Sequence, residues 1–100
     1  MSFEIKNKNV LITGATSGIG EATAIDLAKK GANIFFIARN NLKAQNLSDK
    51  IEFISGKRPK FFIADLASLK NIKESALEFI SLDIPLHVLL NNAGLINNNR

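Results

Sequence analysis

The stretch that decides the fold occupies residues 9–20 and reads NVLITGATSGIG. Its first five residues are apolar or β-branched apart from Asn9, which predicts a strand buried on both faces. From Thr13 to Gly20 the pattern is T-G-x-x-x-G-x-G, and a segment of helical periodicity follows. Because helix N-termini favour anions, a glycine-rich turn in this place is typical of a phosphate site, although the glycines alone are also compatible with a plain tight turn.

The residues of this turn have distinct expected roles. Gly14 permits the tight turn, Gly18 allows a close backbone approach to a pyrophosphate, and Gly20 allows the helix to pack closely on the strand. Thr16 and Ser17 add hydroxyl donors. Together they form the first part of a candidate cofactor site.

Beyond this stretch, short β-branched segments alternate with longer segments of helical period. We expect strands and helices in alternation, over residues 9–13, 18–30, 33–38, 42–54, 60–64, 69–81 and 87–91. Such alternation means parallel strands joined by right-handed crossovers. The predicted fold class is α/β: the N-terminal half of a doubly wound parallel sheet (a Rossmann fold), with strand order 3-2-1-4 and three crossover helices.

Each expected helix carries an apolar stripe that we expect to face the sheet. These stripes consist of Ile19, Thr23, Ala24, Leu27 and Ala28, then Leu47, Ile51 and Ile54, and finally Ile72, Ala76, Phe79 and Ile80. Gly31 is expected to end the first helix and Ser68 to cap the third. Residues 1–100 are therefore expected to form one incomplete dinucleotide-binding domain, truncated after a fourth strand whose open edge suggests further strands.

Arg39 stands nineteen residues past Gly20, at the end of the second expected strand. In a doubly wound fold that strand end lies beside the adenosine ribose of a dinucleotide. A carboxylate there accepts a hydrogen bond from the ribose 2′-hydroxyl, whereas a guanidinium suits a 2′-phosphate. The sequence therefore favours NADP over NAD, with a plain surface arginine as the alternative interpretation.

Two further segments end strands at the same expected edge. Asp65 follows the third strand, where its carboxylate could accept from an adenine amino group while the backbone of Leu66 meets the ring edge. Asp65 is equally well explained as an acidic residue ahead of a helix N-terminus. Asn91–Gly94 reads NNAG at the end of the fourth strand, at the point where strand order reverses and ligands bind, although a bare turn is the alternative.

Taken together, these motifs resemble the short-chain dehydrogenase/reductase family in order and spacing, from about Lys8 to Gly94. The G-x-x-x-G-x-G spacing differs from the G-x-x-G-x-x-G of the extended, epimerase-like branch. Residues 31–40 and 65–69 are similar to the retinol-dehydrogenase-like subgroup, which generally prefers NADP(H). The resemblance implies hydride transfer between NADP(H) and an alcohol or carbonyl substrate.

The resemblance also implies a set of cofactor-binding residues. These are Gly14, Thr16, Ser17, Gly18, Ile19 and Gly20 at the pyrophosphate, Arg39 at the 2′-phosphate, Asp65 and Leu66 at the adenine, and Asn92, Ala93 and Gly94 on the adenosine ribose side. Asn91 is expected to be structural. Many members of the family are dimers or tetramers, so a homo-oligomeric parent is implied as well.

The family's catalytic serine, Tyr-x-x-x-Lys pair and helix asparagine all follow NNAG, and this chain contains no tyrosine. We therefore expect no catalytic residue and no metal ligand within the 100 residues, and the chain alone is predicted to be inactive. His87, the only histidine, is predicted to be structural because it begins a buried strand at the end away from the ligand. A binding-only sensor module and a chain that binds nothing are the alternatives to an enzyme fragment.

Composition narrows the remaining classes. The 46% hydrophobic and 22% charged residues are ordinary for a globular protein, and no apolar run approaches the length of a membrane span. The start of the chain has no apolar signal region. The absence of cysteine excludes disulfides and suits a reducing compartment, so the cytoplasm is expected. The net charge of +4 is scattered over helices, which indicates solvated faces and no nucleic-acid partner.

Overall fold

The computed structural model describes residues 4–16, 18–65 and 67–91. It contains the predicted alternation of strands and helices, in the predicted order. The elements are β1 (Asn9–Thr13), α1 (Gly18–Lys29), β2 (Asn33–Ala38), α2 (Asn41–Ser55), β3 (Lys60–Ile63), α3 (Leu69–Ser81) and β4 (Val88–Asn91). The bounds of β3 and β4 are each one residue shorter than predicted.

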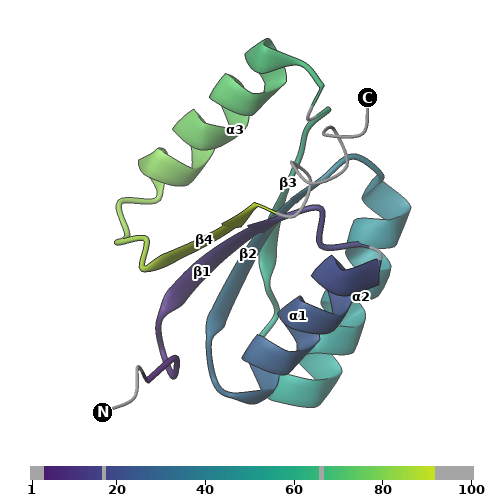
Figure 1. The fold of residues 1–100 in the computed structure, drawn as a ribbon, viewed down its shortest axis with the longest axis vertical. Helices are drawn as coiled ribbons and strands as arrows, with labels where there is room; N and C mark the ends of the chain where they lie inside the picture. The colour runs from purple at the N-terminus through teal and green to yellow at the C-terminus, as the bar shows by residue number, and fades with distance from the viewer. Residues whose placement is uncertain (1–3, 17, 66, 92–100) are drawn as a thin grey trace.

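The strands form one parallel sheet in the order β3-β2-β1-β4, which confirms the predicted 3-2-1-4 arrangement. In the central pairs, Val10 is the register partner of Ile34 on one side and of Val88 on the other. Helices α1 and α2 cover one face of the sheet and α3 lies over the other (Figure 1). This arrangement follows from parallel pairing, because each crossover must return along a face of the sheet.

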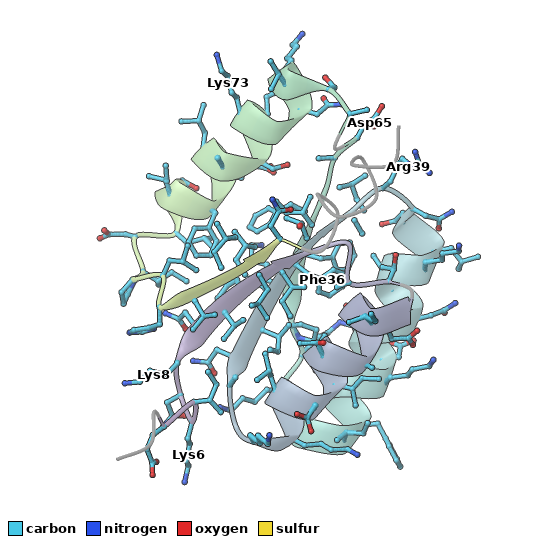
Figure 2. The ribbon with its side chains drawn as sticks, in the orientation of Figure 1. Lys6, Lys8, Phe36, Arg39, Asp65 and Lys73 are labelled. Carbon is cyan, nitrogen blue, oxygen red and sulfur yellow. The ribbon has the colours of Figure 1, made fainter. Side chains whose placement is uncertain are left out.

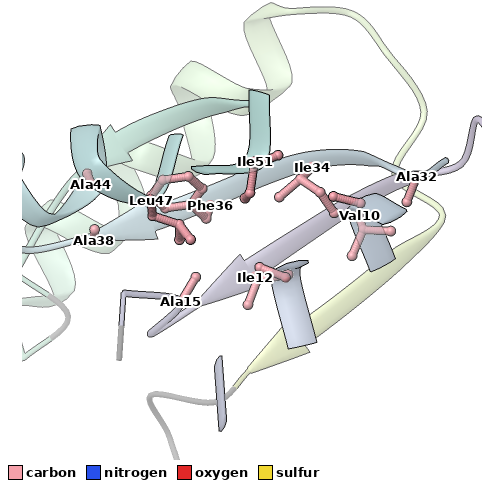
Figure 3. Packing of buried hydrophobic residues seen from close by; sticks show 12 residues of the cluster. Val10, Ile12, Ala15, Ala32, Ile34, Phe36, Ala38, Ala44, Leu47 and Ile51 are labelled. Atoms are coloured by element: carbon pink, nitrogen blue, oxygen red, sulfur yellow. The ribbon is translucent and has the colours of Figure 1, made fainter. Parts of the chain in front are cut away.

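Alternate residues of β1 and β2 serve the two layers. Val10, Ile12 and Phe36 point to the α1–α2 layer, where Leu47 and Ile51 of α2 pack against them (Figure 3). Phe36 is completely buried and stacks on Phe61 of β3, with ring centroids 5.4 Å apart. This period-two alternation with both faces buried is what the continuous apolar run in β1 predicts.

The α3 layer has a separate, smaller core on the other face of the sheet. Leu11, Ile37 and Phe62 of the sheet pack there with Phe79 of α3. The rings of Phe79 and Phe35 form a T-shaped pair, with their centroids 5.3 Å apart and an angle of 88° between the ring planes. Phe79 therefore anchors α3 to the middle strands and to β3.

The predicted stripes of α1 and α2 were each wrong at one position. Ile19 is 74% exposed in the first turn of α1, whereas Gly20, Ala24 and Ala28 form the buried side of the helix. Ile54 is 41% exposed, because the buried side of α2 ends at Ile51.

The predicted stripe of α3 was also partly wrong. Ile80 is 67% exposed and Ala76 is exposed; among the side chains of α3 that the structure describes, Ser75 and Phe79 are the buried ones. The side chain of Ile72 lies outside the described part of the chain.

The helix ends follow the expected chemistry. Asn40 caps α2, its side-chain oxygen accepting from the Lys43 backbone N–H at 2.9 Å. Gly56 ends α2 with φ +79°, and its N–H donates to the Glu52 carbonyl. Ser68 caps α3 as predicted, accepting from the Asn71 N–H at 3.3 Å. Within the described residues, no helix is long and apolar enough to cross a membrane.

His87 joins the beginnings of β1 and β4. The Asn9 backbone N–H donates to His87 Nδ1 at 2.9 Å, and the His87 N–H donates to the Asn9 carbonyl at 3.0 Å. The Asn9 side chain also donates to the Pro85 carbonyl at 2.7 Å. This is the structural role that was predicted for His87.

Candidate functional site

The predicted site residues in the described part of the chain lie along one edge of the sheet, at the carboxyl ends of the strands. Thr13 ends β1, Ala38 ends β2 and Ile63 ends β3, so the residues after them emerge side by side. Figure 2 shows Arg39 and Asp65 together at this end of the molecule, with Lys6 and Lys8 at the opposite end. In open parallel sheets this is the edge at which ligands bind.

The glycine-rich turn adopts a conformation that other residues rarely adopt. Gly14 has φ +69° and Gly18 has φ +56°, both in the left-handed region that favours glycine. A Cβ added to Gly18 meets nothing within 4 Å, so the space beside it is open. Such open space beside a backbone at a helix N-terminus fits the close approach of a phosphate.

Gly20 has a different role: it was predicted to let the helix pack closely on the strand, and its close contacts are with the turn that follows the strand. A Cβ at this position would overlap the carbonyl group of Gly14 and lie 3.1 Å from the Ala15 Cα. Ala15 itself is completely buried. The absence of a side chain at Gly20 therefore sets the distance between α1 and the turn, and with it the place of the helix N-terminus.

Arg39 follows the buried Ala38 directly and is exposed. Among the described residues, its guanidinium has no hydrogen bond or ion pair. By contrast, Arg58 is bonded to Asp49 at 2.8 Å and to Glu52 at 2.9 Å. Those hydrogen bonds, to Asp49 first and then to Glu52, raise the pKa of Arg58 above its usual value. Within the described part of the chain, Arg39 is thus a free cation at the predicted ribose position.

Asp65 organises the turn that leads into α3. Its Oδ1 accepts from the Ala67 N–H at 3.0 Å, and its carbonyl accepts from the Ser68 N–H at 2.9 Å. The preceding residue, Ala64, is buried and donates its N–H to the Ala38 carbonyl at 2.9 Å. The Asp65 carboxylate is therefore held at the edge beside the end of β2, and it remains exposed.

Asn91 is bonded to the neighbouring strand at the switch point. The Thr13 hydroxyl donates to Asn91 Oδ1 at 2.8 Å, and these two residues are register partners in β1 and β4. This contact is the structural role predicted for Asn91. The part played by Thr13 was not predicted, because it depends on which residue of β4 lies opposite.

A cleft of about 180 Å³ lies between the glycine-rich turn and α2, and sequence reasoning missed it. It is lined by Thr16, Glu21, Lys43, Asn46, Leu47 and Lys50. Lys50 Nζ is 2.9 Å from Glu21 Oε2, which joins α2 to the first turn of α1. No local pattern in the sequence signals this cleft, because its lining comes from the turn and from two helices that meet only in the fold.

Two larger hollows lie elsewhere, one of about 220 Å³ around Pro59 and one of about 430 Å³ beside Leu82. Neither includes the glycine-rich turn, Arg39 or Asp65. Five predicted site residues fall outside the described residues: Ser17, Leu66, Asn92, Ala93 and Gly94.

Comparison with known proteins agrees with this geometry. The family model described as short chain dehydrogenase matches residues 8–100. Mouse retinol dehydrogenase 11 is 35% identical over 95% of this chain, and human polyprenol dehydrogenase is 39% identical over 86% of it. The chain spans 30% and 26% of the length of these two relatives. The predicted likeness to retinol dehydrogenases is confirmed.

Solved structures show the same arrangement. L-Sorbose reductase from Gluconobacter frateurii, complexed with NADPH and L-sorbose, superposes with a TM-score of 0.83 at 29% identity, covering 92% of this chain and 35% of that one. A short chain dehydrogenase from Shigella flexneri complexed with NADP has a TM-score of 0.79 at 30% identity, covering 89% and 38%. The chain belongs to the short-chain dehydrogenase family.

Proposed function

We propose that the protein transfers hydride between NADP(H) and an alcohol or carbonyl substrate, and that residues along the carboxyl-end edge of the sheet bind the cofactor. The observation that carries this proposal is Arg39 at the end of β2, exposed and without a partner among the described residues, on the same edge as the glycine-rich turn. A turn with two left-handed glycines before a helix fits a pyrophosphate, and a free guanidinium beside it fits a second phosphate.

Each part of the edge has a proposed role in binding. When bound, the cofactor supplies the redox chemistry, and the protein positions it. Gly14, Gly18 and the first turn of α1 hold the pyrophosphate, with help from the hydroxyl groups of Thr16 and Ser17. Arg39 binds the 2′-phosphate. Ile19 and Gly20 complete the pyrophosphate site. Asp65 and Leu66 bind the adenine, and Asn92, Ala93 and Gly94 bind on the adenosine ribose side.

The preference for NADP over NAD rests on charge. An NAD-specific site needs a carboxylate near the ribose 2′-hydroxyl, whereas the strand end here offers Ala38 and Arg39. The Asp65 carboxylate is partly engaged with the Ala67 N–H. The complexes of two structural relatives with NADPH and NADP support the same preference.

The chemistry at the substrate is proposed to come from a part of the protein outside residues 1–100. This segment contains no tyrosine, so the family's tyrosine acid/base is absent from it, and we propose that the segment is inactive alone. An apolar alcohol is the proposed substrate, because two relatives are named for retinol and polyprenol. We further propose a cytoplasmic homo-oligomer with no nucleic-acid partner.

Arg39→Ala in the complete gene product tests the cofactor assignment. The variant is expected to weaken NADPH binding roughly 10- to 100-fold and to spare NADH, because a charge-assisted hydrogen bond contributes about 1.5–3 kcal/mol. Isothermal titration with each cofactor measures both constants. Equal losses for NADPH and NADH contradict the assignment, and NADPH binding without any turnover of alcohols or aldehydes favours a binding-only module.

A further inference from the structure

Glu21 places a carboxylate in the first turn of α1, next to the glycine-rich turn. It lines the same cleft as Thr16, one of the residues proposed to bind the pyrophosphate. An acidic residue in a first turn stabilises its helix, but the positive end of the helix dipole is also where a phosphate binds. An unpaired carboxylate at this place would therefore repel the pyrophosphate of a cofactor.

The Glu21 carboxylate is paired with a lysine of α2. Lys50 Nζ lies 2.9 Å from Glu21 Oε2, and the side chains of Glu21 and Lys50 are 29% and 59% exposed. Leu47, which is buried and precedes Lys50 by three residues, also lines the cleft. Because Glu21 is partly withdrawn from water, its charge is screened less than that of a fully exposed carboxylate.

The ion pair is not what holds α1 beside α2, although the two helices lie next to each other on one face of the sheet (Figure 1). Ala24 and Ala28 of α1 belong to the same buried apolar core as Leu47 and Ile51 of α2. An ion pair between partly exposed side chains adds little to stability beyond such a core. Lys50 therefore matters more for the charge of the cleft than for the fold.

We infer that Lys50 is a positioning residue for the cofactor and acts through Glu21: it neutralises a carboxylate that would otherwise repel the pyrophosphate. This inference rests on the proposed function and adds a residue that touches no part of the cofactor. The pyrophosphate is common to NADPH and NADH, so the binding of both should depend on Lys50 to the same extent. Arg39, by contrast, is proposed to act on NADPH alone.

Three variants of the complete gene product, titrated with NADPH and with NADH, test the inference. Lys50→Met leaves the carboxylate unpaired and is expected to weaken the binding of both cofactors about 2- to 5-fold. Glu21→Gln leaves the lysine unpaired and is expected to strengthen both by a similar factor. The double variant, which lacks both charges, should lie between the two single variants and near the wild type.

The sign of the Glu21→Gln effect separates an electrostatic role from a mechanical one. A pair that only joins α2 to α1 would make Glu21→Gln and Lys50→Met weaken binding alike, and that result overturns the inference while the proposed function stands. Unchanged affinities in Lys50→Met overturn it as well. A wild-type protein that binds neither cofactor overturns both.

A second ion pair on the same helix supplies the matched control. Asp26→Asn removes a carboxylate that lies 3.1 Å from Lys30 Nζ, farther along α1 from the glycine-rich turn, and should leave both affinities unchanged. Because salt screens charges, added salt should also narrow the difference between Glu21→Gln and Lys50→Met. A difference that does not change with salt contradicts the electrostatic role of Lys50.

Discussion

At the N-terminal ends of the strands polar side chains bond to one another, whereas at the carboxyl ends the Arg39 guanidinium bonds to nothing in the described part of the chain. Lys57 Nζ illustrates the first end: it donates to the side-chain oxygens of Asn7 and Asn33 and to the Gly31 carbonyl, at 3.1–3.3 Å. Arg39 illustrates the second end, since it is exposed and has no partner among the described residues.

The difference between Lys57 and Arg39 distinguishes side chains that stabilise the fold from side chains that are available to bind a ligand. A cation with several partners joins segments that are distant in sequence, and it has no capacity left for a ligand. A cation without partners contributes little to the fold and keeps its capacity for an anion. The same contrast applies to glycine: Gly56 ends a helix, whereas Gly14 and Gly18 shape the edge where a phosphate is proposed.

Gly20→Ala is expected to have the largest effect, because it changes the packing of α1 against the glycine-rich turn at the proposed binding edge. The added Cβ overlaps the Gly14 carbonyl, so α1 must move away from the turn. Backbone overlap of this kind costs roughly 3 kcal/mol, and the same movement should abolish NADPH binding. Urea denaturation and NADPH titration of the complete gene product measure the two effects.

The matched control is Gly56→Ala, at the opposite end of the molecule. Its φ of +79° is strained for alanine, but an added Cβ meets nothing within 4 Å. A loss of about 1 kcal/mol without any change in cofactor affinity is expected. If Gly20→Ala behaves like Gly56→Ala, the close approach of α1 to the turn does not position the binding edge.

The sequence predicted the sheet order because it depends on local signals. The strand and helix periods can be read from short windows, and the handedness of crossovers then leaves few arrangements. The helix faces were harder to predict. Ile19 belongs to an apolar stripe yet is exposed, whereas its neighbour Gly20 lies tightly against the turn. Periodicity shows which apolar residues share a side of a helix, but it does not show how closely that helix packs on its neighbours.

The positions of the candidate site residues were predictable where each residue directly follows a predicted strand. Gly14, Gly18, Arg39 and Asp65 each follow a strand closely, so parallel pairing alone brings them to one edge. The Lys50–Glu21 pair joins α2 to α1 through residues that are 29 positions apart in the sequence, and no local pattern predicts it.

Lys57→Met tests the polar contacts at the N-terminal ends of the strands. Its three hydrogen bonds join the segment before β1, the turn after α1 and the loop before β3. Since the side chain is exposed, we expect the free energy of unfolding to fall by only about 1 kcal/mol, with no change in NADPH affinity. Lys29→Met, which has no side-chain partner among the described residues, should change stability by less than about 0.5 kcal/mol. A weaker NADPH affinity in Lys57→Met would show that the two ends are not independent.

Ser48→Ala is expected to have the smallest effect, and of opposite sign. Ser48 lies in α2 between the two ends, completely buried, and its hydroxyl has no hydrogen-bond partner in the described part of the chain. Removing a buried, unsatisfied hydroxyl should raise the free energy of unfolding by up to about 1 kcal/mol. Ser55→Ala is the control on the same helix: its hydroxyl donates to the Ile51 carbonyl at 2.7 Å and accepts from the Lys57 N–H, so a loss of about 1 kcal/mol is expected. If urea denaturation gives equal losses for the two variants, the Ser48 hydroxyl has a partner in the α1–α2 layer, and polar groups are satisfied there as they are at the N-terminal ends of the strands.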